Sequence, residues 1–474
     1  MEFDIRDDVL VKYNGTGEYV TVPNGVRVIE KEAFRRCESL RAVTLPASVR
    51  TVKTRAFSEC TNLESFFAEE GLECIERQVF GHCTSLRSVT LPSTLTAIGG
   101  SCFSHCESLS EITLPDGVTE LLPLTFLLCK NIKKINASAS LRKIGFCVFD
   151  DIPYWRELLP DENGFVSFTC CLVRYEGKSE RLEIPSRFTN ILQGVFRGNT
   201  SLRSVVLHGG LRVLESNCFR DCTALEEAVF QDGVPLVSDD TFRGCVSLRS
   251  VRLPNTLEWI GTSAFEDCRS LTSVISESKC EYVFPSAFQD CVSLKTASFR
   301  FARYIQVRAF SGCEALEDFT AEDGAVEIME NAFLNCRALK RVRLPASLVC
   351  VSESAFVSID GDGVQTPLEI PTVICPKSLK EAREATRFSS EALCRGFLDS
   401  PALYESCDTD EYISYIFSHT AVFGEILGGM SSADAAEIIA PFSISKEALL
   451  LWASIAEQCG NEELAELLSE EAGA

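Results

Sequence analysis

The sequence predicts an α+β repeat solenoid with short parallel strands, followed by a small all-α C-terminal domain. Three observations lead to this prediction. A phenylalanine recurs every 23 residues, and a cysteine usually follows it by three positions. A run of alternating apolar and polar residues and often a proline come next, in the same order. Near residue 376 this pattern gives way to helical periodicity with many acidic side chains.

The repeat is marked by phenylalanines in two runs. Every step within a run is 23 residues, except one of 22 between Phe288 and Phe310. A fixed period of roughly 20–29 residues is typical of a leucine-rich-repeat solenoid. The marker residues are Phe34, Phe57, Phe80, Phe103, Phe126 and Phe149, then Phe196, Phe219, Phe242, Phe265, Phe288, Phe310, Phe333 and Phe356.

Each unit has three parts, as residues 29–51 illustrate. A tight coil, E-K-E-A-F-R-R-C, precedes a short strand, L-R-A-V-T-L, in which Val43 and Leu45 face the interior. Pro46 ends the strand because proline has no N–H to donate to a ladder. One unit cannot bury its own apolar residues, so we expect the units to stack as an array.

The consensus I-x-x-x-A-F-x-x-C-x-S-L-x-x-V-x-L-P-x-x-L resembles the BspA-type leucine-rich repeat of many bacterial and some protist proteins. The resemblance covers residues 26–150 and 188–357. It implies a bacterial protein, and the family consists mostly of surface proteins and adhesins. Fold alone does not determine function, so this role is an expectation by analogy.

The chain divides into five predicted segments. Residues 3–22 alternate around turn signals, as expected of a small antiparallel cap. A shift of 162 residues aligns this cap, without a gap, with a second cap-like element, and pairs Leu10 with Leu172, Tyr13 with Tyr175 and Phe34 with Phe196.

The two arrays form either separate blocks or one continuous solenoid, and the immediate return of the strand phase favours continuity. The segments are an N-terminal β cap (1–25), a first array (26–150), a connector with the second cap-like unit (151–187), a second array (188–366) and an acidic α-helical domain (367–474).

The connector contains Trp155 in a short helix-like piece, Tyr154 to Leu159. We interpret this tryptophan as a plug over the end of the first array, because large aromatic side chains usually bury their area. The alternative is an exposed anchor.

The C-terminal domain has six Lys and Arg residues against nineteen Asp and Glu. Gly460 suits a helix stop and Asn461 the N-cap of a last helix. The acidity is either only a solvated outer surface, or the domain caps the last coil, burying Leu450, Leu451, Trp452 and Ile455, or it forms a separate interaction module. We favour capping combined with an interaction role. The other expected helices are Ser378–Phe388, Ser390–Leu398, Asp410–Ile426, Ser432–Ile439 and Lys446–Gln458.

The formal net charge is −23, which makes nucleic acid and anionic membranes poor partners. No run approaches the ~18 apolar residues of a membrane helix, so we expect no membrane insertion. The N-terminal residues lack the features of a secretory signal. We therefore predict a cytoplasmic protein with reduced thiols, although the family resemblance leaves surface exposure by another route open.

Eleven of the 23 cysteines occupy one repeat position. They could serve metal or redox chemistry, but zinc sites favour clustered pairs such as C-x2-C. We therefore expect a ladder of small buried side chains that fill a narrow interior slot. These residues are Cys37, Cys60, Cys83, Cys106, Cys129, Cys222, Cys245, Cys268, Cys291, Cys313 and Cys336.

Other candidate sites are weaker. His82 and His105 are 23 residues apart and each precedes a ladder cysteine, but no other coil repeats the histidine. Asp360-Gly-Asp362-Gly resembles part of a calcium loop but lacks the closing glutamate, so a turn is the better interpretation. No phosphate loop, nucleophile elbow or zinc-protease motif is present. We predict no enzyme activity, no cofactor and no small-molecule substrate.

The candidate site is the outward face of the repeat sheet. If Val43 and Leu45 point inward, the position of Thr44 points outward in every coil. Several coils carry apolar or Arg residues there, as expected of a surface that binds a protein partner. The alternative is β-branched filler, which strands favour anyway. The predicted binding residues are Phe67, Val206, Val229, Arg252, Ile275 and Arg343.

Overall fold

The structure is a computed structural model that describes residues 2–138, 140–145, 147–149, 152, 158–322, 324, 327–440, 442 and 444–473. It is a β-solenoid of about 14 turns, with helices in the C-terminal region. The chain clusters into two compact units, residues 1–197 with 210–219, and residues 198–209 with 220–474. The proposed position of Trp155 lies outside the described residues.

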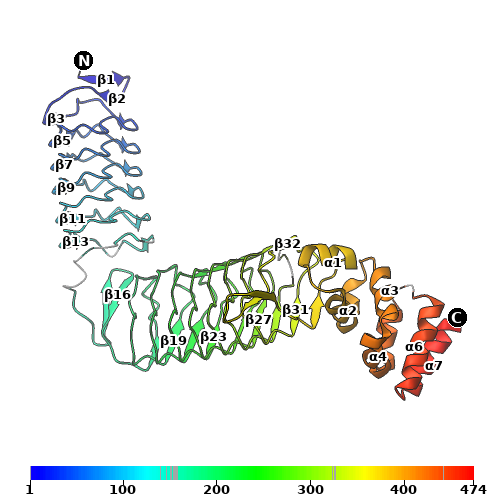
Figure 1. Ribbon diagram of the computed structural model, residues 1–474. Helices are drawn as coiled ribbons and strands as arrows, with labels where there is room; N and C mark the ends of the chain where they lie inside the picture. Colours follow the sequence, from blue (N-terminus) through cyan, green and yellow to red (C-terminus); the bar gives the residue numbers. More distant parts are fainter. Residues whose placement is uncertain are drawn as a thin grey trace. The chain divides into compact units, whose positions relative to one another are not determined.

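Each coil contributes one strand to a wide face and a two-residue strand to a narrow face, and both sets pair in parallel (Figure 1). In the first unit the wide strands are β3 (Tyr19–Thr21), β5 (Ala42–Leu45), β7 (Ser65–Ala68), β9 (Ser88–Thr90), β11 (Glu111–Thr113), β13 (Lys134–Asn136) and β17 (Arg181–Glu183). The narrow strands are β4 (Val28–Ile29), β6 (Thr51–Val52), β8 (Cys74–Ile75), β10 (Ala97–Ile98), β12 (Glu120–Leu121), β14 (Lys143–Ile144), β18 (Asn190–Ile191) and β20 (Val213–Leu214).

The second unit continues both types of strand. Its wide strands are β19 (Ser204–Leu207), β21 (Glu227–Phe230), β23 (Ser250–Arg252), β25 (Ser273–Ser276), β27 (Thr296–Phe299), β29 (Asp318–Thr320), β31 (Arg341–Arg343) and β35 (Thr372–Ile374). Its narrow strands are β22 (Leu236–Val237), β24 (Trp259–Ile260), β26 (Tyr282–Val283), β28 (Tyr304–Ile305), β30 (Glu327–Ile328) and β32 (Cys350–Val351), and a hairpin follows with β33 (Val357–Ile359) and β34 (Gln365–Pro367).

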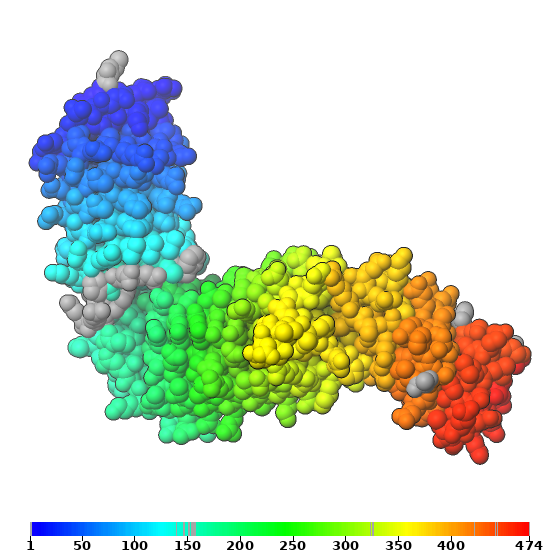
Figure 2. Space-filling model, in the orientation of Figure 1, coloured from blue at the N-terminus to red at the C-terminus, as the bar shows by residue number. Residues whose placement is uncertain are grey.

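The repeat phenylalanines form stacks in the core. The Phe265 ring lies 5.3 Å from the Phe242 ring and 5.1 Å from the Phe288 ring, both nearly parallel to it. All three side chains are fully buried. The 23-residue spacing therefore places these three rings on one another, and on the face seen in Figure 2 the surface of the coils is closed over the core.

The ladder cysteines are structural donors within this core. The Cys60 Sγ donates to the Phe34 carbonyl at 3.0 Å, and the Cys268 Sγ donates to the Phe242 carbonyl at 3.3 Å. Burial raises the pKa of the Cys83 and Cys129 thiols to about 12. Ten of the eleven ladder thiols are buried, as the sequence predicts, whereas Cys37 in the first coil is half-buried. Most of the buried ones, such as Cys83 and Cys313, donate a weak hydrogen bond to a carbonyl of the preceding coil.

The coil around most of the repeat phenylalanines is tight because two residues in it have left-handed backbones. In the Phe265 coil these are Ser263, with φ of 52°, and Asp267, with φ of 63°. Asn, Asp and Gly adopt this conformation more readily than other residues. Many coils of the second array accordingly carry one of them just before the cysteine, as Asp221, Gly244, Asp267, Asp290, Gly312 and Asn335 do.

The first unit contains two antiparallel hairpins of the same design. Strand β1 (Phe3–Arg6) pairs with β2 (Val9–Tyr13), and β15 (Phe165–Phe168) pairs with β16 (Cys171–Tyr175), each with one register shift at the equivalent place. The Tyr13 hydroxyl accepts from the Gly17 N–H at 3.0 Å, and the Tyr175 hydroxyl accepts from the Ser179 N–H at 3.4 Å. The 162-residue shift therefore relates local structures as well as residues.

The C-terminal helices are α1 (Leu379–Thr386), α2 (Ser390–Asp399), a 3-10 turn (Pro401–Tyr404), α3 (Asp410–Ser418), α4 (Thr420–Gly429), α5 (Ser432–Ile439), α6 (Lys446–Gln458) and α7 (Glu462–Gly473). Ser378 and Glu381 form a capping box at the start of α1. Gly460 has φ of 78°, and the Asn461 side chain accepts from the Leu464 N–H at 3.2 Å, which confirms the predicted stop and N-cap.

The expected single helix Asp410–Ile426 is wrong, because the chain bends at His419 between α3 and α4. The His419 ring stacks 4.0 Å from the Tyr415 ring, and its Nδ1 lies 2.9 Å from the Tyr415 carbonyl. This side chain thus supplies a partner at the helix end, which lets α4 start in a new direction.

The expected capping contact of Leu450 and Leu451 is also wrong, since both side chains are exposed. Trp452 and Ile455 are buried, but the Trp452 indole N–H donates to the Leu427 carbonyl of α4 at 2.9 Å. The last coil is instead contacted by α1 and α2, which pack against β32 and β35. No described helix is both long and apolar enough to span a bilayer.

Candidate protein-interaction site

In most coils the wide face presents one outward side chain between two buried ones, whereas the neighbours of Thr90 in β9 and of Arg252 in β23 are half-buried. In β5 the side chains of Val43 and Leu45 are buried, whereas Ala42 and Thr44 are half-exposed. The parallel register places equivalent residues side by side, because Thr44 pairs with Phe67, which in turn pairs with Thr90. The predicted outward positions therefore form a row along each unit.

Phe67 is the predicted site residue in the first unit, and its side chain is 45% exposed. Its neighbours in register are Thr44 and Thr90, so polar residues lie on both sides of the ring. The second unit contains the other five predicted residues. Phe67 is thus an isolated apolar residue on the row of its own unit.

In the second unit, four predicted residues lie in consecutive coils. Val206, Val229 and Arg252 are direct partners in the parallel register of β19, β21 and β23. Ile275 occupies the same position in β25, which adjoins β23, and its side chain is 56% exposed. The structure therefore brings an exposed isoleucine, two half-buried valines and an exposed arginine together on one surface.

Arg343 lies further along the same row, beyond Ser298 and Thr320. Its guanidinium lies 3.4 Å from the Glu322 carboxylate, and Arg300 lies 3.8 Å from that carboxylate. Arg343 is therefore part of a charged cluster at one end of the row, separated from the apolar residues by two polar coils.

Ion pairs between successive coils border the row. Arg203 donates to Glu226 at 2.6 Å, and Lys340 donates to Glu317 at 2.7 Å. The Lys340 hydrogen bond lowers the pKa of Glu317, and Glu317 raises the pKa of Lys340. The border is thus polar around an apolar centre, as in many protein interfaces.

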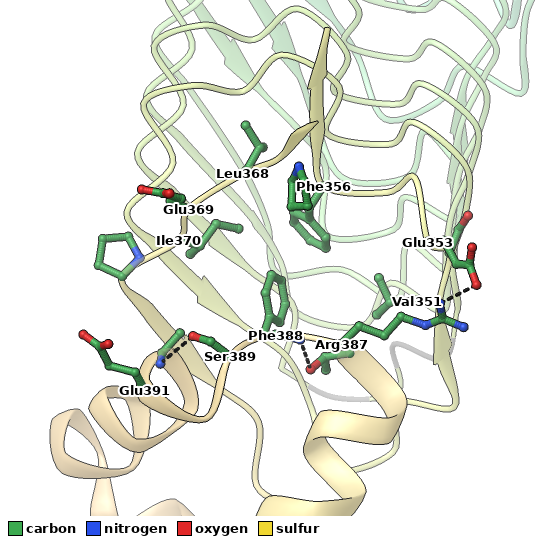
Figure 3. Close-up of a pocket in the computed structure, with 15 residues that line it drawn as sticks. Val351, Glu353, Phe356, Leu368, Glu369, Ile370, Arg387, Phe388, Ser389 and Glu391 are labelled. Atoms are coloured by element: carbon green, nitrogen blue, oxygen red, sulfur yellow. Dashed lines mark hydrogen bonds and ion pairs between the residues drawn. The ribbon is translucent and has the colours of Figure 1, made fainter. Parts of the chain in front are cut away.

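A cavity of about 730 Å³, which the sequence analysis missed, lies between the last coil and α1 and α2 (Figure 3). Phe388 takes the place of a next repeat ring, at 5.1 Å from Phe356 and tilted by 58°. The Arg387 guanidinium pairs with the Glu353 carboxylate at the edge. The only sequence signal is that no phenylalanine follows Phe356 by 23 residues, which leaves one ring face open.

The rings of His82 and His105 stack on each other, with centroids 4.2 Å apart and an interplanar angle of 15°. Burial and the neighbouring His82 lower the pKa of His105. Among the described residues no cluster of three or more His, Cys, Asp or Glu could hold a metal ion. The Asp360 carboxylate accepts from the Asp362 and Val364 N–H groups at 3.0 and 2.9 Å, which supports the turn interpretation.

The model of the BspA type leucine rich repeat region matches the chain in six overlapping copies, 12–133, 51–170, 124–249, 173–295, 212–320 and 300–372. No match was found among curated proteins. Three solved structures are similar to the chain over most of their own length. A leucine-rich cell surface protein from Faecalibacterium prausnitzii A2-165 is 20% identical, with 67% of this chain and 92% of that chain covered and a TM-score of 0.37.

A leucine-rich-repeat protein from Bacteroides ovatus is 23% identical, covers 72% of this chain and 90% of its own, and has a TM-score of 0.31. The pneumococcal vaccine antigen PcpA is 16% identical, with 81% and 90% covered and a TM-score of 0.35. Because these TM-scores are below 0.5, the family assignment depends on the repeat match alone.

Proposed function

Because the chain belongs to the BspA-type leucine-rich-repeat family, we propose that it is a non-catalytic scaffold that binds a protein partner along the wide sheet face. Members of this repeat family are typically non-catalytic. The observation that carries the proposal is the row of Val206, Val229, Arg252 and Ile275 in consecutive coils. Phe67 and Arg343 are proposed as outlying contacts.

The physical basis is preorganisation. The row lies on hydrogen-bonded strands, so a partner that docks there would order few side chains of this protein. Arginine is one of the residues in which binding energy concentrates, and the apolar neighbours of Arg252 would help to exclude water from it in a complex. An extended partner segment that runs across the coils would meet one of these side chains about every 4.8 Å.

The test is the double variant Val229→Asp with Ile275→Asp, which places two carboxylates at the apolar centre. The control is Thr90→Asp with Asn136→Asp, at the same outward position and also two coils apart in the first unit. After pull-down and identification of the partner, we expect the test variant to raise Kd at least about tenfold, or ~1.4 kcal/mol. Unchanged affinity with an intact circular dichroism spectrum would refute the sheet-face assignment.

We also propose that the protein acts in a reducing compartment such as the cytoplasm, because the ladder thiols donate hydrogen bonds only when reduced. Protease treatment of intact cells tests this location. Protection of the protein in the soluble fraction is the expected result. Digestion on intact cells would favour a surface adhesin or host-contact role instead.

A further inference from the structure

The narrow face of the second unit carries a continuous apolar ridge, formed by Leu236, Trp259, Tyr282, Phe284, Tyr304 and Val307. Leu236, Trp259, Tyr282 and Tyr304 occupy the first position of β22, β24, β26 and β28, in direct register. The second residue of each of these strands is fully buried. The first residue therefore points away from the core in four consecutive coils.

The side chains of the ridge are large and partly exposed to solvent. Trp259 is 36% exposed and Val307 is 37% exposed, while the other four members are half-buried. The Tyr282 ring lies 4.9 Å from the Tyr304 ring and 5.8 Å from the Phe284 ring, and both pairs are stacked. These three stacked rings form one connected apolar surface, and Trp259 adjoins Tyr282 in the strand register.

The fold does not require these aromatic residues. The same strand position in the first array holds Val28, Thr51, Cys74, Ala97, Glu120 and Lys143, and the strands there pair in the same parallel register. Small and charged side chains thus fit this position without disrupting the coil. The large apolar groups at this position in the second unit are therefore not a condition of the coil itself.

The charge around the ridge indicates its partner. Carboxylates outnumber basic side chains around it in the same and the following coil. The carboxylates are Asp239, Glu258, Glu281, Glu327 and Glu330, and the basic residues are Lys279, Arg303 and Arg308. Arg303 lies 3.6 Å from the Glu281 carboxylate, so its charge is largely compensated. An apolar strip with acidic borders is complementary to a segment that carries both apolar and basic side chains.

We propose that the ridge is a second protein-binding surface, which takes a basic, apolar peptide segment of another protein. Nucleic acid is unsuited because the borders and the whole chain are acidic. A second copy of this chain is unsuited for the same reason, since acidic borders would face each other. The proposal is independent of the wide-face site, because different residues form it.

The test uses the full chain and a displayed library of random 12-residue peptides. Binders are selected on the unaltered protein and then compared with Trp259→Ala/Tyr282→Thr, which copies the residues at Ala97 and Thr51 of the first array. That variant should fold normally, because the same coil position already accepts these side chains. The control is Val229→Asp/Ile275→Asp, which leaves the ridge intact.

We expect selected peptides rich in Arg, Lys and apolar residues, with affinity lowered at least tenfold by the ridge variant and unchanged by the control. Substitution of their basic residues by Glu should abolish binding, and substitution of their apolar residues by Ser should weaken it as much as the ridge variant does. The proposal is overturned if no ridge-dependent peptides emerge, if they are acidic, or if an arginine peptide without apolar residues binds equally well. A ridge-dependent dimer in sedimentation would also overturn it.

Discussion

Removal of one ring from the phenylalanine stack tests how this solenoid is held together. Phe265 is fully buried, and its ring faces lie against Phe242 at 5.3 Å and Phe288 at 5.1 Å. Truncation of a buried phenylalanine to alanine costs about 3–5 kcal/mol through lost burial and the cavity left behind. Because stacked rings on both sides hold the cavity walls apart, we expect Phe265→Ala to cost about 4 kcal/mol.

The loss of stability should be concentrated in the coils next to the substitution, because a coil contacts only its neighbours. Hydrogen exchange should show reduced protection in the coils of Phe242, Phe265 and Phe288, with much less change in α6 and α7. Urea unfolding, followed by circular dichroism, should show a lower midpoint. The control is Trp259→Ala in the preceding strand of the same array, which removes a partly exposed aromatic side chain and should cost about 1–2 kcal/mol, clearly less than Phe265→Ala.

The reasoning would be refuted if Phe265→Ala destabilised the protein by less than about 1.5 kcal/mol, the level of a tolerated core replacement. Equal effects of Phe265→Ala and Trp259→Ala would also refute it, because burial would then not set the difference. A uniform loss of protection across the whole second unit, including α6 and α7, would contradict the neighbour-only coupling.

Three further predictions follow from the cysteines, a buried tyrosine and a paired carboxylate. At pH 8 an alkylating reagent should label Cys350 and Cys459 first, because they are exposed, together with Cys170, because its hydrogen bond with Cys171 lowers its pKa to about 6. All 23 thiols should react only after unfolding. Rapid labelling of buried ladder positions such as Cys83 in the folded protein would contradict the burial that raises their pKa. Tyr404→Phe should destabilise the protein by about 1–3 kcal/mol in urea unfolding, because the Tyr404 hydroxyl accepts a hydrogen bond from the buried Cys375 N–H at 2.9 Å. A neutral effect would mean that this N–H finds another partner. Hydrogen bonds from two arginines lower the pKa of Glu59 in the folded protein, so its contribution to stability is present above its unfolded pKa and is lost as pH falls through its folded pKa. The difference in unfolding free energy between the unaltered protein and Glu59→Gln should therefore shrink from about pH 6 to about pH 3. A pH-independent difference would exclude the ion pairs as its source.

Much of the coil structure was predictable because its contacts recur at a fixed sequence offset. The 23-residue spacing predicted the register that places Val229 beside Val206, and the Phe265 stack follows from the same spacing. The alternation of buried and exposed residues in the wide strands followed from the strand period of two. The candidate binding row was therefore predictable as a set of positions, although not the degree of exposure of each side chain.

The narrow face and the end of the array were not predictable in this way. The ridge was overlooked because its strands have only two residues, too few to show an alternating pattern. The cavity beside Phe388 depends on a contact with Phe356 at a separation that no repeat specifies. Helix boundaries such as the capping box at Ser378 were readable locally, but the bend at His419 was not.

The sequence by itself determined the repeat, the coil core, the strand faces and most helix ends, because these depend on spacing and on local backbone preference. Only the tertiary structure decided which helices cover the last coil, which leucines of α6 remain exposed, and where the aromatic side chains of the narrow face come together. The physical reason is that helix packing and surface exposure depend on neighbours at no fixed sequence distance. In a solenoid coil, by contrast, the neighbour is always one repeat away.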